Sequence, residues 1–156
     1  MLRSHLVGLM TLLLVAGCGG GGPAVPLHPA SGTVEVDGKP AAGVMVRLHP
    51  ADALDDIDRP QPFATTGEDG SFRLGTFEKE DGAPAGSYKV TLFLPDRPLA
   101  GPGTPIDLLG DRYTHPARSG LDATIVEGPN QIPPFQVLKV PRPRRAPQPP
   151  SSNGID

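Results

Sequence analysis

Proline and glycine interrupt this sequence so often that a long helix has no uninterrupted stretch in which to form. The 156 residues include 21 prolines and 20 glycines, and proline breaks a helix interior while glycine weakens it. After the first 18 residues no stretch keeps an apolar period of 3.6 residues. Short runs that alternate apolar and polar residues are common instead. The sequence therefore predicts an all-β fold.

The alternating runs also predict which side chains face the core. Their apolar faces carry Val34, Val36, Val44, Val46, Leu48, Phe72, Leu74, Tyr88, Val90, Leu92, Leu94, Leu121, Ala123, Ile125, Phe135 and Val137. Run 31–40, which is closed by a turn at Asp37-Gly38, and run 43–50 together predict a β-hairpin. About seven short strands, each with one apolar face, favour two sheets that cover one another in a seven-stranded β-sandwich.

The longest connection in this scheme runs from residue 95 to residue 120. It has room for a short helical turn at 106–109, and a loop of this length is either functional or a lid over one sandwich edge. We expect the Tyr113 hydroxyl to tie the loop to the sandwich, as a corner tyrosine does.

The segment before Cys18 has the layout of an export signal. Arg3 supplies positive charge, and Leu6 to Ala16 form an apolar run of eleven residues, which is shorter than the roughly 20 residues that span a bilayer. Val15, Ala16 and Gly17 precede Cys18 and resemble a bacterial lipobox, in which the cysteine is lipidated and the signal is cut off before it. An ordinary cleaved signal with an incidental thiol, or an uncleaved anchor, are the alternatives.

These features divide the chain into four parts. Residues 1–17 are a lipoprotein signal peptide, 18–30 a Gly/Pro-rich tether, 31–140 the β-sandwich domain, and 141–156 a Pro-rich tail expected to be disordered. Cys18 is the only cysteine, so no disulfide within the chain supports the fold. The net charge of −3 gives no basic footprint for a nucleic-acid partner.

Several of these motifs together resemble one family, the carboxypeptidase regulatory-like domain, which is transthyretin-like or prealbumin-like. The motifs are Gly32-Thr33-Val34, Gly38-Lys39-Pro40, Gly43-Val44-Met45-Val46, Thr65-Thr66, Asp69-Gly70-Ser71-Phe72-Arg73-Leu74 and Pro84-Ala85-Gly86-Ser87-Tyr88-Lys89-Val90. Farther on, Arg112-Tyr113, Pro116, Ser119-Gly120-Leu121 and Gly128-Pro129-Asn130 are similar to the C-terminal half of small bacterial lipoproteins that carry this domain. The resemblance implies a prealbumin-like (Ig-like) sandwich.

The same resemblance implies a role. The domain is usually a noncatalytic accessory or binding module, so we expect no enzyme and no cofactor. Lipoproteins without aspartate after the cysteine are generally sorted to the outer membrane, and Gly19 follows Cys18 here. The expected location is therefore the cell envelope, with the lipid-anchored chain on the outer membrane and facing the periplasm.

Two enzyme families with related sandwiches offer an alternative. Transthyretin-like hydrolases that open the 5-hydroxyisourate ring end in Tyr-Arg-Gly-Ser, whereas this chain has only the reversed pair Arg112-Tyr113. Intradiol dioxygenases bind iron through two tyrosines and two histidines. Tyr88, Tyr113, His49 and His115 supply those residue types, but no His-x-His pair is present. We predict no catalytic, cofactor or metal site.

The remaining charged segments have two interpretations each. Asp52, Asp55, Asp56 and Asp58 offer oxygen ligands for calcium but lack the spacing of an EF-hand, so a solvated acidic loop is favoured. Arg142, Arg144 and Arg145 form either a solvated tail or a contact to an anionic polymer or lipid head group.

Three hypotheses follow from these observations. The leading one is a noncatalytic lipid-anchored module that docks an envelope protein through a sheet edge or the 95–120 loop. The alternatives are an exported small-ligand or calcium-binding module and a transthyretin-like hydrolase.

Overall fold

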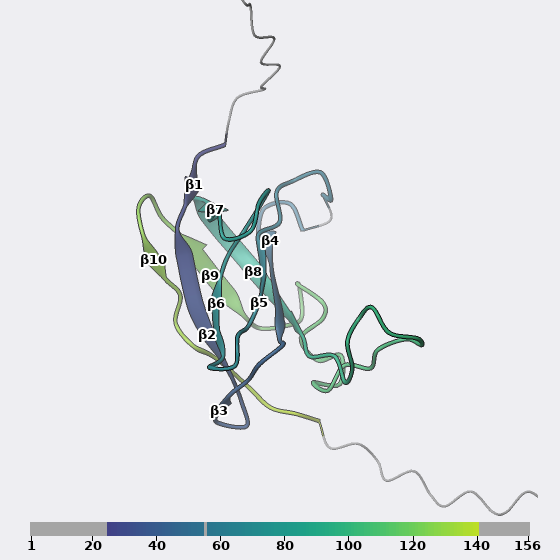
Figure 1. The fold of residues 1–156 in the computed structure, drawn as a ribbon. Helices are drawn as coiled ribbons and strands as arrows, with labels where there is room; N and C mark the ends of the chain where they lie inside the picture. Colours follow the sequence, from purple (N-terminus) through teal and green to yellow (C-terminus); the bar gives the residue numbers. More distant parts are fainter. Residues whose placement is uncertain (1–24, 55, 141–156) are drawn as a thin grey trace, which may run out of the picture.

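The computed structural model describes residues 25–54 and 56–140, which form a β-structure without helices (Figure 1). The predicted signal peptide, Cys18, the first part of the tether and the tail 141–156 lie outside these residues. The strands are β1 Leu27–His28, β2 Ala30–Val36, β3 Lys39–Pro40, β4 Met45–Pro50, β5 Phe63–Thr65, β6 Ser71–Arg73, β7 Ala83–Pro84, β8 Gly86–Phe93, β9 Asp122–Ile125, β10 Asn130–Gln131 and β11 Phe135–Val137. No helix in the described ranges is long and apolar enough to cross a membrane.

Two sheets form the layers of the fold. In one, β2 pairs with β10 and β11 in parallel, and with β3 and β6 antiparallel. The other has the antiparallel order β5-β4-β8-β9. A small ribbon of β1 and β7 joins the chain entry to the sandwich. The all-β fold is confirmed, and the arrangement is that of a β-sandwich.

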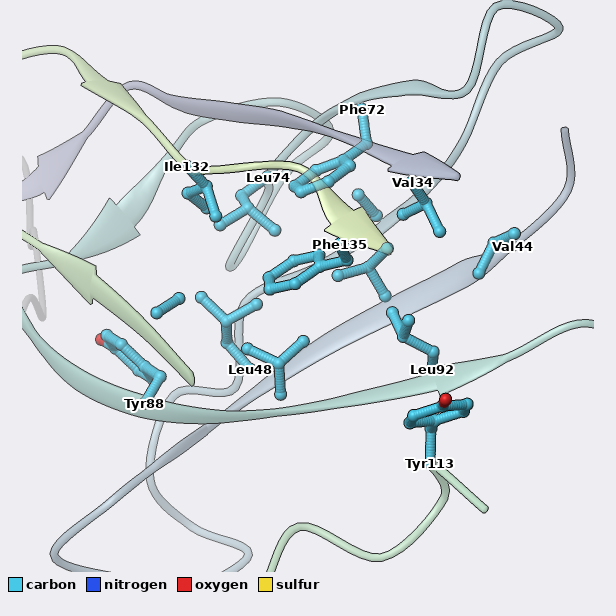
Figure 2. Packing of buried hydrophobic residues seen from close by; sticks show 14 of the residues in the cluster. Val34, Val44, Leu48, Phe72, Leu74, Tyr88, Leu92, Tyr113, Ile132 and Phe135 are labelled. Carbon is cyan, nitrogen blue, oxygen red and sulfur yellow. The ribbon is translucent and has the colours of Figure 1, made fainter. Parts of the chain in front are cut away.

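The core lies between the two sheets, where the predicted inward faces meet. Every residue named for these faces is buried except Leu121, which is partly buried. Phe72 of β6 and Phe135 of β11 stack with their ring centroids 6.2 Å apart (Figure 2). Gly32 makes room for this pair, because a Cβ there would lie 2.6 Å from Cζ of Phe72.

The predicted hairpin of runs 31–40 and 43–50 is wrong, because β2 and β4 belong to different sheets. The Asp37-Gly38 turn does form, with φ of 53° and 73°, but it returns the chain only to β3. Gly43, with φ of 75°, then redirects the chain to the opposite layer. The two apolar faces therefore meet across the core instead of lying side by side in one sheet.

Pairing begins slightly before the predicted domain boundary at residue 31. Leu27 and His28 pair with Pro84 and Ala83, and Ala30 is already buried in the core. The backbone of His28 packs directly on Gly82, where a Cβ would lie 2.5 Å from the His28 carbonyl oxygen. The chain enters beside β1 and leaves near β3, at the opposite end of the sandwich (Figure 1).

The 95–120 loop covers the part of β8 that β9 does not reach. Backbone bonds from Val90 to Leu121, from Leu92 to Tyr113 and from Leu108 to Leu94 continue the edge of the sheet. Asp107 organises the loop, since its buried carboxylate accepts amide bonds from Leu94, Leu109 and Asp111 at 2.9 to 3.1 Å. Residues 106–109 form no helix, but a single turn begins at Asp107, whose carbonyl accepts the Gly110 amide at 3.2 Å. The loop thus closes a sheet edge that would otherwise be open to pairing.

The corner tyrosine of this fold is Tyr88 and not Tyr113, contrary to our expectation. The Tyr88 hydroxyl donates a 2.8 Å hydrogen bond to the carbonyl of Pro84, four residues upstream, which is the contact typical of a tyrosine corner. Tyr113 ties the loop down in another way, through its buried ring and its backbone carbonyl.

Candidate functional site

The four residues with the types of a dioxygenase iron site do not come together. Tyr88 on β8 and Tyr113 in the 95–120 loop lie far apart, with Leu48 between them and Tyr113 beside Leu92 (Figure 2). His49 lies on the outer face of the β4–β8 pair, and His115 is exposed in the loop. No cluster of three or more His, Cys, Asp or Glu suited to a metal occurs within 25–54 and 56–140.

The acidic loop shows charge pairing at its ends. Asp52 forms a 3.7 Å ion pair with Arg59, and a carboxylate oxygen of Asp56 accepts the amide of Asp58 at 3.0 Å. Asp55 lies outside the described residues. The Asp52 and Asp56 carboxylates therefore contact a cation and an amide of their own loop.

His49 is held in a specific contact on the outer face of the sheet. Its Nε2 lies 2.9 Å from the hydroxyl of Thr91, and it stands opposite Lys89 of β8. Partial burial, together with the nearby Arg47 guanidinium, lowers the pKa of His49 below its usual value. The folded protein therefore favours the neutral imidazole.

This shift predicts how stability depends on pH. Because the pKa of His49 is lower in the folded state, the unfolded chain takes up a proton first as the pH falls below about 6.5, and folding stability decreases there. Urea unfolding followed between about pH 7.5 and pH 5 should show this loss, and His49→Gln should remove part of it. His115→Gln, at an exposed site, is the matched control and should leave the profile unchanged. If His49→Gln and His115→Gln gave the same dependence of stability on pH, His49 would not be the source of the loss.

A groove of about 620 Å³ lies along the edge where β5 of one sheet meets β6 of the other. We call it the Phe63–Phe77 groove. Its lining residues are Phe63, Ala64, Thr65, Gly67, Ser71, Phe72, Arg73, Gly75, Phe77, Glu78, Lys79 and Glu80. Its volume is in the range of small-ligand and peptide sites.

The floor of the groove is a short stretch in which β5 and β6 run side by side, with backbone hydrogen bonds joining them at each end. Phe63 and Gly75 exchange two backbone bonds of 2.8 and 3.0 Å, and the Gly67 amide donates to Ser71 at 2.8 Å. Thr65 and Arg73 fall between these two pairs in the same register. In the alternation of antiparallel strands, their backbone groups point away from β4 and β2 and toward each other across the space between β5 and β6. The floor is therefore a short stretch of β5 and β6 held together on both sides by backbone hydrogen bonds.

The wall of the groove is a rigid turn at residues 76–81. The Asp81 carboxylate accepts the amides of Thr76, Phe77 and Glu78 at 2.6, 3.1 and 2.8 Å. Desolvation opposes ionisation of Asp81, but these bonds together lower its pKa. Gly75 allows the turn to fold back on β6, since a Cβ there would overlap the backbone of Glu78 and Glu80.

This turn holds an aromatic ring in solvent. Phe77 is 65% exposed and Phe63 is 53% exposed, and both line the same groove. Exposed apolar rings that are grouped, and that border polar and charged groups, are typical of an interaction surface. Sequence reasoning missed this site, because a single phenylalanine in a polar turn carries no periodic signal.

A second cavity, of about 670 Å³, lies at the end of the sandwich where the chain enters. Pro50, Pro60, Pro84 and Tyr88 line it, together with the Asp52–Arg59 ion pair. Burial raises the pKa of Tyr88; the Arg59 guanidinium opposes this rise and the Asp52 carboxylate adds to it. This cavity is therefore mainly apolar, with one charge pair at its rim.

Comparisons with known proteins give no family for this chain. No family model and no curated protein matches it. Among solved structures, it is similar to a 9R-lipoxygenase from Cyanothece PCC8801, with 15% identity and a TM-score of 0.38 over 78% of this chain. The match covers 18% of the lipoxygenase, so the chain spans about a fifth of that protein's length.

A second similar structure is the dioxygenase domain of a dioxygenase carbohydrate-binding protein fusion from Streptomyces sp. SirexAA-E. It shares 25% identity with a TM-score of 0.36, over 75% of this chain and 82% of that domain. The prediction that this chain is not an enzyme is contradicted by these two matches to oxygenases, and we do not keep it. At these TM-scores neither match argues for a particular reaction, substrate or metal.

Proposed function

We propose that this chain is a lipid-anchored cell-envelope protein whose β-sandwich binds an extended segment of another envelope protein in the Phe63–Phe77 groove. The observation that carries the proposal is the pair of exposed phenylalanines held on ordered supports around one groove. Grouped aromatic side chains supply much of the binding energy at protein interfaces.

We further propose that the sandwich is prealbumin-like with seven principal strands, as the carboxypeptidase regulatory-like domain resemblance implies. Its support is that β2, β4, β5, β6, β8, β9 and β11 each have three or more residues, whereas the other strands have two. These seven strands occupy the same stretches of sequence as the alternating runs.

The place of the groove relative to the anchor agrees with a partner in the envelope. Eight residues lie between Cys18 and Leu27, where strand pairing starts, and the nine steps along the chain span at most about 30 Å. The groove wall ends at Asp81, directly before Gly82, which packs on His28. A chain lipidated at Cys18 on the outer membrane therefore keeps the groove within reach of membrane-associated and periplasmic proteins.

A second candidate function is the binding of a small ligand, and the cavity beside Tyr88 is the observation that favours it. Apolar walls with a few polar groups at the rim are characteristic of small-molecule sites. The described aspartates give the calcium-binding alternative no further support.

Photo-crosslinking in cells tests the proposed function. A photoreactive residue replaces Glu80 at the groove rim, and Phe77→Ala is introduced in the same chain. We expect one envelope protein to crosslink, and its yield to fall about tenfold in Phe77→Ala, because loss of a central aromatic contact typically weakens binding by more than about 1 kcal/mol.

The matched control is Leu99→Ala, since Leu99 is 54% exposed but lies in the 95–120 loop and not in the groove. This control should keep the full yield. Equal yields in both variants, or a larger loss in Leu99→Ala, would show that the groove is not the docking site.

A further inference from the structure

We propose that this chain forms a dimer in which β9 pairs, antiparallel, with β9 of a second copy and joins the two β5-β4-β8-β9 sheets into one. In the order of that sheet, β9 is the edge strand opposite to β5. The Phe63–Phe77 groove lies on the β5 side, so the dimer leaves the groove open. This inference therefore does not depend on the proposed function, and each can fail without the other.

The outer edge of β9 carries backbone groups that its own sheet does not use. The Val90 amide donates to the Leu121 carbonyl at 2.8 Å, so this pair is a hydrogen-bonded one in the register of β8 and β9. Two residues farther along the chain, Ala123 is bonded to β8 in the same way. The amides and carbonyls of Asp122 and Thr124 alternate with these and point away from β8. They are therefore free to pair with a further strand.

The other sheet edges in residues 25–54 and 56–140 are covered or interrupted. β5 and β6 bond to one another, and the 95–120 loop covers the rest of β8. The edge formed by β10 and β11 is interrupted by Pro133 and Pro134, which have no amide hydrogen. β9 has neither cover nor proline, and its one charge, Asp122, is already paired with Lys89 at 2.5 Å. An edge of this kind is open to pairing with another chain.

One register uses all of the free groups. With Asp122 opposite Thr124 of the second copy, each of the two symmetric pairs exchanges both of its backbone hydrogen bonds. A shift of two residues in one direction would require Val126, whose amide and carbonyl are both held by the Asn130 side chain at 2.9 Å. A shift in the other direction would require Gly120, where a φ of 69° ends the extended backbone.

The side chains agree with the same register. The twofold axis passes beside Ala123, whose small side chain allows the two copies to approach closely. On the outer face, the Thr124 hydroxyl stands opposite the Asp122 carboxylate of the second copy, which places a donor opposite an acceptor. On the inner face, Leu121 falls opposite Ile125 of the second copy. Leu121 is only partly buried in one chain, and the second copy would cover it.

The symmetry of this dimer is compatible with the proposed lipid anchor. A twofold axis between antiparallel strands of one sheet is perpendicular to the sheet, so the ends where the two chains enter point in opposite directions along the strands. When one face of the joined sheets lies toward the membrane, both Cys18 residues are at the same height above it. The eight residues between Cys18 and Leu27 then connect each copy to the same bilayer.

Disulfide formation in cells tests the pairing and its register. A contact through one four-residue strand is small, and small interfaces are weak, so a covalent link is the suitable readout. Ala123→Cys places two thiols at a non-hydrogen-bonded pair, with Cα atoms about 4.5 Å apart, which a disulfide can bridge. Thr124→Cys is the matched control, because its two copies lie diagonally, about 8 Å apart, which is too far for a disulfide.

Mild oxidation should therefore link Ala123→Cys into dimers at least about fivefold more than Thr124→Cys. This order is the reverse of what random collision gives, since Ala123 is buried and Thr124 is exposed. The native chain, in which Cys18 is the only cysteine, provides the baseline.

Two proline variants of the Ala123→Cys chain test the strand edge. Thr124→Pro removes an amide that points away from β8, a position where an edge strand tolerates proline. The dimer loses one backbone bond from each copy, so we expect the yield to fall about tenfold. Gln136→Pro removes an outward amide from β11, because the neighbouring Val137 faces β2 through its bond to Asp37. This control should keep the full yield.

Three results would overturn the proposal. Equal yields from Ala123→Cys and Thr124→Cys would indicate random collision, and a higher yield from Thr124→Cys would indicate another register; this comparison needs no proline variant to fold. A yield that Thr124→Pro leaves unchanged, or that Gln136→Pro lowers equally, would show that the β9 edge does not form the contact. Urea unfolding of both proline variants shows that any loss of yield comes from a folded chain.

Discussion

Replacing Asp107 with alanine should lower the free energy of unfolding by about 3 kcal/mol, the largest loss we expect from a single polar substitution in this domain. The Asp107 carboxylate is buried and accepts three backbone amides, of Leu94, Leu109 and Asp111. Alanine leaves those donors without a partner, and each unsatisfied buried donor costs about 1 kcal/mol or more. Urea denaturation measures the change through the shift of its midpoint.

The effect should extend beyond these hydrogen bonds. Asp107 holds Leu109 in the core, where that side chain is fully buried, and it keeps the 95–120 loop over the second half of β8. Losing that cover exposes a strand edge, so aggregation of Asp107→Ala at high concentration should also increase.

Asp58→Ala removes the same charge from an exposed position and should change stability by less than about 0.5 kcal/mol. Asp107→Asn keeps one acceptor oxygen, so its loss of stability should lie between the losses of Asp58→Ala and Asp107→Ala. A loss below about 1 kcal/mol for Asp107→Ala would mean that water replaces the carboxylate, and that the loop does not depend on it.

The core could be predicted from the sequence because a strand exposes alternate residues to one side. Val44, Val46 and Leu48 are all buried, and Arg47 between them is exposed. The pairing of strands could not be predicted in the same way. Alternation shows which face of a strand is buried, but it does not show whether the next strand lies beside it or in the opposite sheet. In this fold, β2 and β4 lie in opposite sheets.

Residues without periodicity were beyond this kind of prediction. Leu109 enters the core from an irregular loop, because the Asp107 carboxylate fixes the local backbone and not because of an apolar pattern. The two tyrosines show the same limit. Both are evident by residue type, but it is the folded backbone that brings the Tyr88 hydroxyl to the Pro84 carbonyl.

The candidate groove was the least predictable feature. Phe77 is exposed because Asp81 captures three amides of its turn and Gly75 lets that turn fold back on β6. None of these contacts has a distinct sequence pattern.

Changing Cys18 to serine should release the protein from the membrane almost completely. Serine at this position lacks the thiol that accepts the diacylglyceryl group of a lipoprotein. One acyl chain gives only marginal binding, whereas two or more anchor a protein stably, at about 0.8 kcal/mol per buried CH₂. We therefore expect a shift of more than about a hundredfold from membrane pellet to supernatant.

Mass spectrometry of the N-terminal peptide makes the test specific. The native chain should begin at Cys18 with the added mass of its acyl groups, and Gly20→Ser, which leaves the cysteine in place, should behave as the native chain does. Retention of Cys18→Ser in the pellet would instead assign the anchor to the apolar run before Cys18. A native peptide without acyl mass in the supernatant would remove the membrane from the proposed function, and the groove would then act in a freely exported domain.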